Sequence, residues 1–187
     1  ITALRETLID GTYITSSYHV FERQCGEKTR VIYKLPYYPD RIVHHAVLQV
    51  ILPILVKNLI HDTYACVPGR GIHKCAKKIA ELLRRDVSPK YCLKMDIKKF
   101  YPSIDHETLK KSIRRQIKCE PTLALLDEII DSAPGLPIGN YLSQHLANLY
   151  MSCFDHWIKE VKRVKHYYRY SDDIVILGYD KAELHIL

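Results

Sequence analysis

The stretch Tyr170-Ser171-Asp172-Asp173 lies between two short runs, residues 164–169 with two tyrosines and the apolar residues 174–177, which the sequence predicts to be β-strands. Two adjacent carboxylates at the tip of an apolar hairpin are unfavourable, because they repel each other and because desolvation disfavours both charges. Such a pair makes physical sense if a cation binds it. Asp96 lies 76 residues earlier (172 − 96), near the end of another strand-like run, residues 91–97. Carboxylates that face one another from a strand and a neighbouring hairpin are a ligand set for two divalent ions, which stabilise the attacking and leaving oxygens of a phosphoryl transfer.

Composition sets the outer limits of the interpretation. A chain of 187 residues is one large domain or two small lobes. Its 28 Lys and Arg residues against 21 Asp and Glu residues give a formal charge of +7, which favours a polyanionic partner. The 14 tyrosines suit wet, partly apolar surfaces, including base-stacking platforms, although most are expected at the edge of the core.

The cysteines and the apolar segments favour a reducing, cytoplasmic location. The six cysteines are scattered and contain no Cys-x-x-Cys, which predicts reduced thiols. The longest apolar region, residues 47–60, is interrupted and too short for a membrane span, so no membrane association is expected. No signal peptide is recognisable, and a start without Met and a stop just after a strand suggest a piece of a longer protein.

The order of predicted elements indicates an α+β fold. A strand is expected at residues 30–35, and a helix is expected from Asp40 as its cap, with Pro53 kinking or ending it. The predicted buried stripe of that helix is Ile42, Val43, Ala46, Val47, Val50, Ile51 and Ile54. Further helices are expected from residue 72 to Ser88-Pro89, at 108–117, at 123–130 and from Leu142 to Val161, after a turn-rich loop at 134–140. Helices on one face of an antiparallel sheet fit this order.

Three segments resemble the catalytic motifs of reverse transcriptases. Residues 93–106, Leu-Lys-Met-Asp-Ile-Lys-Lys-Phe-Tyr-Pro-Ser-Ile-Asp-His, resemble the first motif. Residues 170–173 resemble the Tyr-x-Asp-Asp motif, and residues 135–144, Gly-Leu-Pro-Ile-Gly-Asn-Tyr-Leu-Ser-Gln, resemble the loop and helix between the two. Asp40-Arg41-Ile42-Val43 and the basic strand before it resemble the fingers of the group II intron branch. The three motifs occur in the right order, which makes the resemblance specific.

The resemblance implies a right-hand polymerase architecture of fingers and palm, with an antiparallel palm sheet backed by helices. Residues 1–90 are expected to form the fingers and residues 91–187 the palm, with helices near 106–133 adjoining the fingers. No thumb is expected in this stretch. Residues Ile138-Gly139-x-x-x-Ser143-Gln144 stand where most of the branch has Gln-Gly-x-x-x-Ser-Pro. This departure resembles the error-prone reverse transcriptases of diversity-generating retroelements, which are bacterial or phage-encoded and work with a small basic accessory protein.

The resemblance also implies the ligands of the catalytic ions. Asp96, Asp172 and Asp173 would be the catalytic carboxylates, and the backbone carbonyl of Ile97 would be a further metal contact. Two Mg²⁺ ions are expected, with Mn²⁺ as an alternative. For Asp96 the alternative is a strand-end turn residue, although strands disfavour Asp. For Asp173 the alternative is a turn residue that caps the hairpin.

Residues that bind the nucleotide are implied in the same way. Lys28 and Arg30 would hold the triphosphate, unless they are solvated residues on a turn. Phe100 or Tyr101 would pack under the sugar and exclude a 2′-hydroxyl; we favour Phe100, and the other would be a core residue. Gly139 would allow close approach to the templating base pair.

The template and primer contacts complete the implied site. Arg41 would fix the fingers or the template, and Ser143 and Gln144 would lie near the template strand, with a plain helix cap as the alternative for Ser143. Tyr170 would lie against the primer end, or would be an ordinary strand aromatic. The implied partners are template RNA, a DNA or RNA primer and dNTPs.

Two rival functions stay open. One is a reverse transcriptase of another kind, from a retron, a group II intron or a phage-defence system. The other is an inactive RNA-binding scaffold with a polymerase fold. The presence of Asp96, Asp172 and Asp173 argues against the scaffold, because a site without chemistry has no reason to keep three acids that repel each other.

Overall fold

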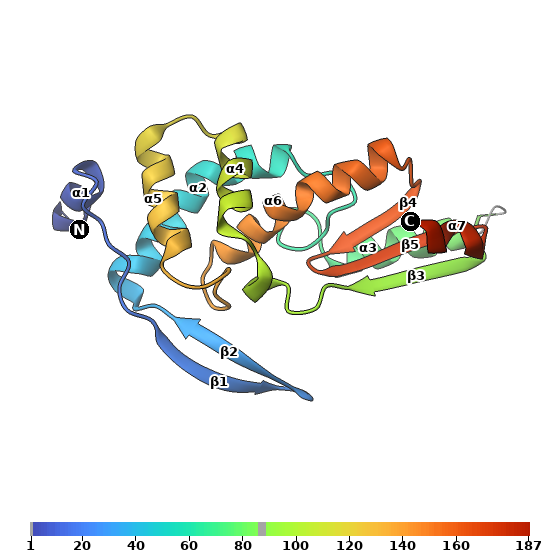
Figure 1. The fold of residues 1–187 in the computed structure, drawn as a ribbon, viewed down its shortest axis with the longest axis horizontal. Coiled ribbons are helices and arrows are strands. Elements are labelled where there is room, and N and C mark those ends of the chain that lie inside the picture. The colour runs from blue at the N-terminus through green and yellow to red at the C-terminus, as the bar shows by residue number, and fades with distance from the viewer. Residues whose placement is uncertain (1, 86–88) are drawn as a thin grey trace. The chain divides into compact units, whose positions relative to one another are not determined.

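The computed structural model describes residues 2–85 and 89–187 of the chain (Figure 1). The chain forms two compact units, and each unit is built from two separate segments. The first unit comprises Ile1–Lys57 and Tyr101–Tyr150, and the second comprises Asn58–Phe100 and Met151–Leu187. The predicted fingers (1–90) and palm (91–187) do not coincide with these units, and they stay a functional prediction.

The first unit contains a β-hairpin and several helices. Its elements are α1 (Thr2–Ile9), β1 (His19–Cys25), β2 (Lys28–Lys34), α2 (Ile42–Lys57), α4 (His106–Gln116), α5 (Glu120–Asp131) and the first part of α6 (Ser143–His156). Strands β1 and β2 pair in an antiparallel register that closes at Cys25 and Lys28. Gly26 opens the two-residue turn with φ +63°, a conformation that glycine adopts without strain.

Helix α2 departs from the sequence-based prediction in three ways. Asp40 does not cap it; this carboxylate is buried in a preceding helical turn, where Oδ1 accepts from the Tyr13 hydroxyl at 2.6 Å and from the Ser16 amide at 3.1 Å. The helix does not end at Pro53 but continues to Lys57, because residues on both sides of the proline pack into the core. The buried residues are Val43, His44, Leu48, Ile51 and Leu55, so the predicted stripe is rotated, and Val50 is 72% exposed.

The second unit contains a three-stranded antiparallel sheet. Its elements are α3 (Ile72–Leu83), β3 (Tyr91–Asp96), the end of α6, a helical turn at Trp157–Val161, β4 (His166–Tyr170), β5 (Asp173–Gly178) and α7 (Lys181–Ile186). The strand order is β3-β5-β4, with β5 in the centre. Helix α3 packs on one face of the sheet through a cluster of Tyr64, Cys75, Tyr168 and Leu177, with Ile79, Leu82 and Val175 at its edge.

Mixed helices and antiparallel sheets confirm the predicted α+β class. The predicted helices and strands are found at their expected places within a few residues, although Ser88 lies outside the described residues. The six cysteines, all within the described residues, are free. By length and composition alone, the helical stretch Tyr37–Lys57 could cross a membrane, which the sequence did not predict; part of it is buried within the first unit.

Candidate active site

Asp96 and Asp173 lie at the same end of the sheet of the second unit. Asp96 is the last residue of β3 and lies opposite Asp173, the first residue of β5, in the antiparallel register. Residues directly opposite each other in such a pair have their side chains on the same face. Asp172 is the preceding residue, in the two-residue turn between Tyr170 and Asp173. Two like charges placed opposite each other are unfavourable without a cation.

A lysine partly compensates this charge. Lys94 Nζ lies 3.5 Å from Asp173 Oδ1, and both side chains are largely accessible, at 69% and 49%. An exposed ion pair of this kind contributes little stability. Its lysine can therefore leave when a stronger cation binds.

The donor set fits a divalent ion that shares its coordination with substrate. No group of three or more His, Cys, Asp or Glu residues is arranged to hold a metal ion within residues 2–85 and 89–187. Mg²⁺ needs fewer protein ligands, because it commonly uses one or two carboxylates and completes its coordination with water and substrate phosphates. Asp96 and Asp173 supply two carboxylates on one face, and Asp172 lies beside them.

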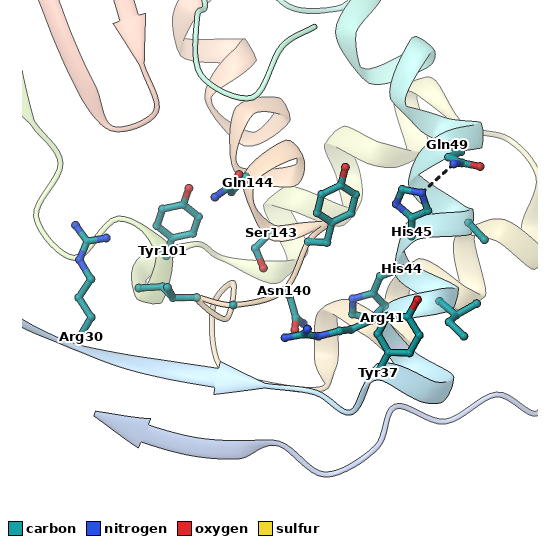
Figure 2. A pocket seen from close by; sticks show the side chains of 15 residues that line it. Arg30, Tyr37, Arg41, His44, His45, Gln49, Tyr101, Asn140, Ser143 and Gln144 are labelled. Carbon is teal, nitrogen blue, oxygen red and sulfur yellow. Dashed lines mark hydrogen bonds between the residues drawn. The ribbon is translucent and has the colours of Figure 1, made fainter. Parts of the chain in front are cut away.

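The first unit contains a large groove with a cationic and aromatic lining (Figure 2). Its volume is about 860 Å³. The lining residues with polar or aromatic side chains are Arg30, Tyr37, Arg41, His44, His45, Gln49, Tyr101, Asn140, Tyr141, Ser143 and Gln144. Arg30 comes from β2, and His45 and Gln49 come from α2 (Figure 2). None of the described lining residues is acidic, so the groove is suited to an anionic ligand.

Two glycines fix the loop that forms one wall of this groove. A Cβ on Gly139, which has φ +123°, would lie 2.4 Å from the carbonyl oxygen of Tyr33. A Cβ on Gly135, which has φ +60°, would lie 2.5 Å from the carbonyl oxygen of Tyr101. Backbone hydrogen bonds join the same partners: the Tyr33 amide donates to Ile138 at 2.8 Å, and the Leu136 amide donates to Tyr101 at 2.9 Å. Packing within the unit therefore explains the need for glycine at position 139, whatever its role toward a base pair.

Three of the four template and primer residues predicted from the sequence line this groove, in different environments. Ser143 is buried, and its hydroxyl donates to the carbonyl oxygen of Pro137 at 2.7 Å, so it holds the loop. Gln144 and Arg41 are exposed and line the groove. Tyr170 belongs to the second unit, where it pairs with Asp173 and is 36% exposed.

Of the nucleotide-binding residues predicted from the sequence, some line the groove and others do not. Arg30 is exposed and lines the groove, whereas Lys28 is exposed at the tip of the hairpin. Tyr101 is half-buried and faces the groove, whereas Phe100, which we favoured from the sequence, is only 4% exposed. Ile97 directly follows β3 and is half-buried.

Sequence reasoning missed several residues around the groove. Tyr37 and Tyr141 are 74% and 53% exposed, and the ring centroids of His45 and Tyr141 lie 5.5 Å apart. The buried ring of His44 also lines the groove, and its Nε2 has no hydrogen-bond partner among the described residues. Burial lowers the pKa of His44 to about 4, so the ring is neutral at pH 7.

The second unit contains a further pair that the sequence did not reveal. Arg169 and Asp155 form an ion pair in which both side chains are fully buried. An arginine immediately before the Tyr-x-Asp-Asp stretch was visible in the sequence. Its partner, 14 residues earlier on a helix, has no spacing that identifies it.

Comparison with known proteins identifies the class. Residues 23–187 match the family model described as reverse transcriptase (RNA-dependent DNA polymerase). This match spans most of the chain, and the chain therefore belongs to the reverse transcriptase family. Enzymes of this family use divalent metal ions.

Individual relatives are distant. The chain is 24% identical to "Protein YkfC" of Escherichia coli (strain K12) over 171 residues, which cover 84% of this chain and 45% of YkfC. Among solved structures, apo telomerase from Candida tropicalis truncated from its C-terminal domain matches with a TM-score of 0.69 and 15% identity over 91% of this chain and 45% of that one. Telomerase from Candida albicans with a fragment of telomeric RNA matches with a TM-score of 0.69 and 12% identity over 92% and 39%. The chain spans less than half the length of these proteins, and the telomerase likeness shows the fold alone.

Proposed function

We propose that the protein containing this chain is an RNA-directed DNA polymerase that makes cDNA by nucleotidyl transfer with two divalent ions. The observation that carries the proposal is the placement of Asp96 opposite Asp173, beside Asp172, in a chain of the reverse transcriptase family. When bound, the ions would lower the pKa of the primer 3′-hydroxyl and neutralise the triphosphate. Asp96, Asp172 and Asp173 would hold them, with the carbonyl of Ile97 as a further contact.

The groove of the first unit supports the assignment of substrate class. Single-stranded nucleic acid binds where cationic side chains follow the backbone and aromatic rings stack on bases. Arg30 and Arg41 supply the charge, and Tyr37 and Tyr141 supply exposed rings. We assign template RNA and the incoming dNTP to this groove, with Tyr101 as the residue that excludes a 2′-hydroxyl, because Phe100 is buried.

Primer extension by the full-length protein on a defined RNA template tests this function. Asp172→Asn keeps the size of the side chain and removes its charge, so we expect Mg²⁺-dependent dNTP incorporation to fall to background while the fold is retained. Asp180→Asn is the matched control, because Asp180 caps α7 through the Ala182 amide and asparagine caps equally well. Undiminished incorporation by Asp172→Asn would overturn the metal assignment.

The finer assignment is an error-prone enzyme of a diversity-generating retroelement, a bacterial or phage-encoded cytoplasmic protein that works with a small basic accessory protein. The departure at Ile138 and Gln144 from the common motif supports it. Errors read opposite each template base in the same assay are expected to concentrate at adenines. Uniform errors would instead favour a retron, group II intron or phage-defence enzyme, and a wild-type protein that binds RNA without incorporation would favour the inactive scaffold.

A further inference from the structure

The turn that carries Asp172 has a conformation that needs support. Ser171 has φ +58°, in the left-handed region that non-glycine residues rarely adopt. Residues held in such regions cost on the order of 1–3 kcal/mol and persist only where surrounding contacts fix them. Ser171 therefore depends on surrounding contacts to keep its backbone in this conformation.

The guanidinium of Arg169 provides that contact. Its Nη1 donates to the carbonyl oxygen of Ser171 at 2.9 Å. This carbonyl belongs to the same planar peptide group as the amide nitrogen of Asp172. A hydrogen bond that fixes the plane of this peptide also fixes where the Cα of Asp172 lies, and so the origin of its side chain.

Asp155 makes the burial of Arg169 feasible. Arg169 Nε lies 2.8 Å from Asp155 Oδ1, and Nη2 lies 2.6 Å from Oδ2, which is a two-point contact between a guanidinium and a carboxylate. Asp155 also accepts from the Tyr167 hydroxyl at 2.5 Å and from the Thr63 hydroxyl at 3.3 Å. Burial beside this carboxylate raises the pKa of Tyr167, so the phenol stays a neutral donor. Both carboxylate oxygens are therefore satisfied inside the unit.

We infer that the Asp155–Arg169 pair is a positioning device for the carboxylate turn: Asp155 fixes the guanidinium, and the guanidinium fixes the Ser171–Asp172 peptide in the conformation that presents Asp172. This inference rests on the proposed function for the purpose of the turn. Neither residue needs to touch an ion or a substrate. Partners that orient metal ligands commonly change metal affinity about 10- to 100-fold when they are removed.

Arg169→Lys separates positioning from folding. Lysine keeps a positive charge for Asp155, but it lacks the planar fork that reaches two partners at once. We expect the variant to unfold cooperatively, and we expect amides at the turn, residues 170–173, to exchange with solvent at least about tenfold faster in the metal-free protein, while residues 174–177 of β5 stay protected. Mn²⁺ binding measured by electron paramagnetic resonance is expected to weaken about tenfold or more, and primer extension to require correspondingly more Mg²⁺.

Arg114→Lys is the matched control. Arg114 lies in the first unit, and its guanidinium also makes a two-point contact with a carboxylate, that of Asp127. This variant should leave both the exchange at the turn and Mn²⁺ binding unchanged. If Arg169→Lys does not fold, the double variant Asp155→Asn/Arg169→Gln, which buries no charge, takes its place with the same expectations.

The outcomes separate the two claims. Unchanged turn exchange and unchanged Mn²⁺ binding in a folded variant would overturn the positioning role. Loss of cooperative unfolding in both variants would also overturn it, because the pair would then be needed for the fold as a whole. A wild-type protein that incorporates no dNTP would overturn the proposed function, whereas the exchange comparison in metal-free protein would still decide whether the pair holds the turn.

Discussion

The loop at residues 134–140 in the first unit and the turn at residues 171–172 in the second are both held in fixed conformations, but by different contacts. The loop is held by close backbone approach, since Gly135 and Gly139 leave no room for a Cβ. The turn is held by a buried charge pair, since Arg169 bonds the Ser171 carbonyl and Asp155 neutralises the arginine.

Because the loop and the turn are held by different contacts, different substitutions should destabilise them. Steric positioning fails when a side chain is enlarged and is insensitive to charge. Positioning by a buried ion pair fails when one partner is removed, because the remaining charge is then left in a medium of low polarity. Substitutions in the two units should therefore separate these mechanisms, and the expected losses of stability can be ranked.

The largest effect is expected from Asp155→Ala in the second unit. This substitution leaves Arg169 buried without its partner, which costs roughly 3–5 kcal/mol of the free energy of unfolding. Urea unfolding at pH 7 measures the loss. Asp127→Ala is the control, because Asp127 pairs with Arg114 at the surface, where both side chains are partly exposed and the expected cost is below about 1 kcal/mol. Equal losses of stability in the two variants would contradict the claim that a buried ion pair holds the turn of the second unit.

A smaller loss is expected from Gly139→Ala in the first unit. The added Cβ would meet the Tyr33 carbonyl oxygen at 2.4 Å, and alanine also disfavours φ +123°. Overpacking and backbone strain together should cost roughly 3 kcal/mol, measured by the same urea titration. Gly11→Ala isolates the contact, because Gly11 has φ +67° but a Cβ added there would meet nothing within 4 Å. If both variants lose the same stability, the approach to Tyr33 is not what holds the loop.

The sequence predicted the elements of both regions but only part of their support. Glycine and proline at 134–139 indicated a fixed loop, because these residues restrict local conformation whatever surrounds them. Asp96 and Asp173 were predicted to converge, because strand patterns place residues at the ends of strands. The contact between Asp155 and Arg169 was not predictable, since it joins a helix to a strand through tertiary packing alone.

The same limit explains the errors in the first unit. Helix α2 is apolar on more than one face, so periodicity could not decide which residues are buried, and Val50 was predicted to be buried although it is exposed. The burial of His44 at the groove depends on this rotation. Tyr101 and Phe100 are adjacent, and only the path of the chain after β3 decides that Tyr101 faces the groove.

The smallest of the ranked effects is a pH dependence that should belong to His44 of the first unit. Desolvation lowers the pKa of its ring to about 4, against an ordinary value of 6.5, and the nearby Asp40 carboxylate opposes this shift. The unfolded chain therefore binds a proton between pH 6.5 and 4 that the folded chain does not, so stability is full above pH 6.5 and is lost as the pH falls toward 4. Between pH 7 and pH 5 the free energy of unfolding should fall by about 2 kcal/mol, as measured by urea unfolding.

His44→Gln, which cannot be protonated, should lose this part of the pH dependence, whereas His45→Gln, an exposed neighbour on the same helix, should retain it. A wild-type slope that persists in His44→Gln would show that other titratable groups, such as the half-buried His145 and the buried His166, govern the response to acid.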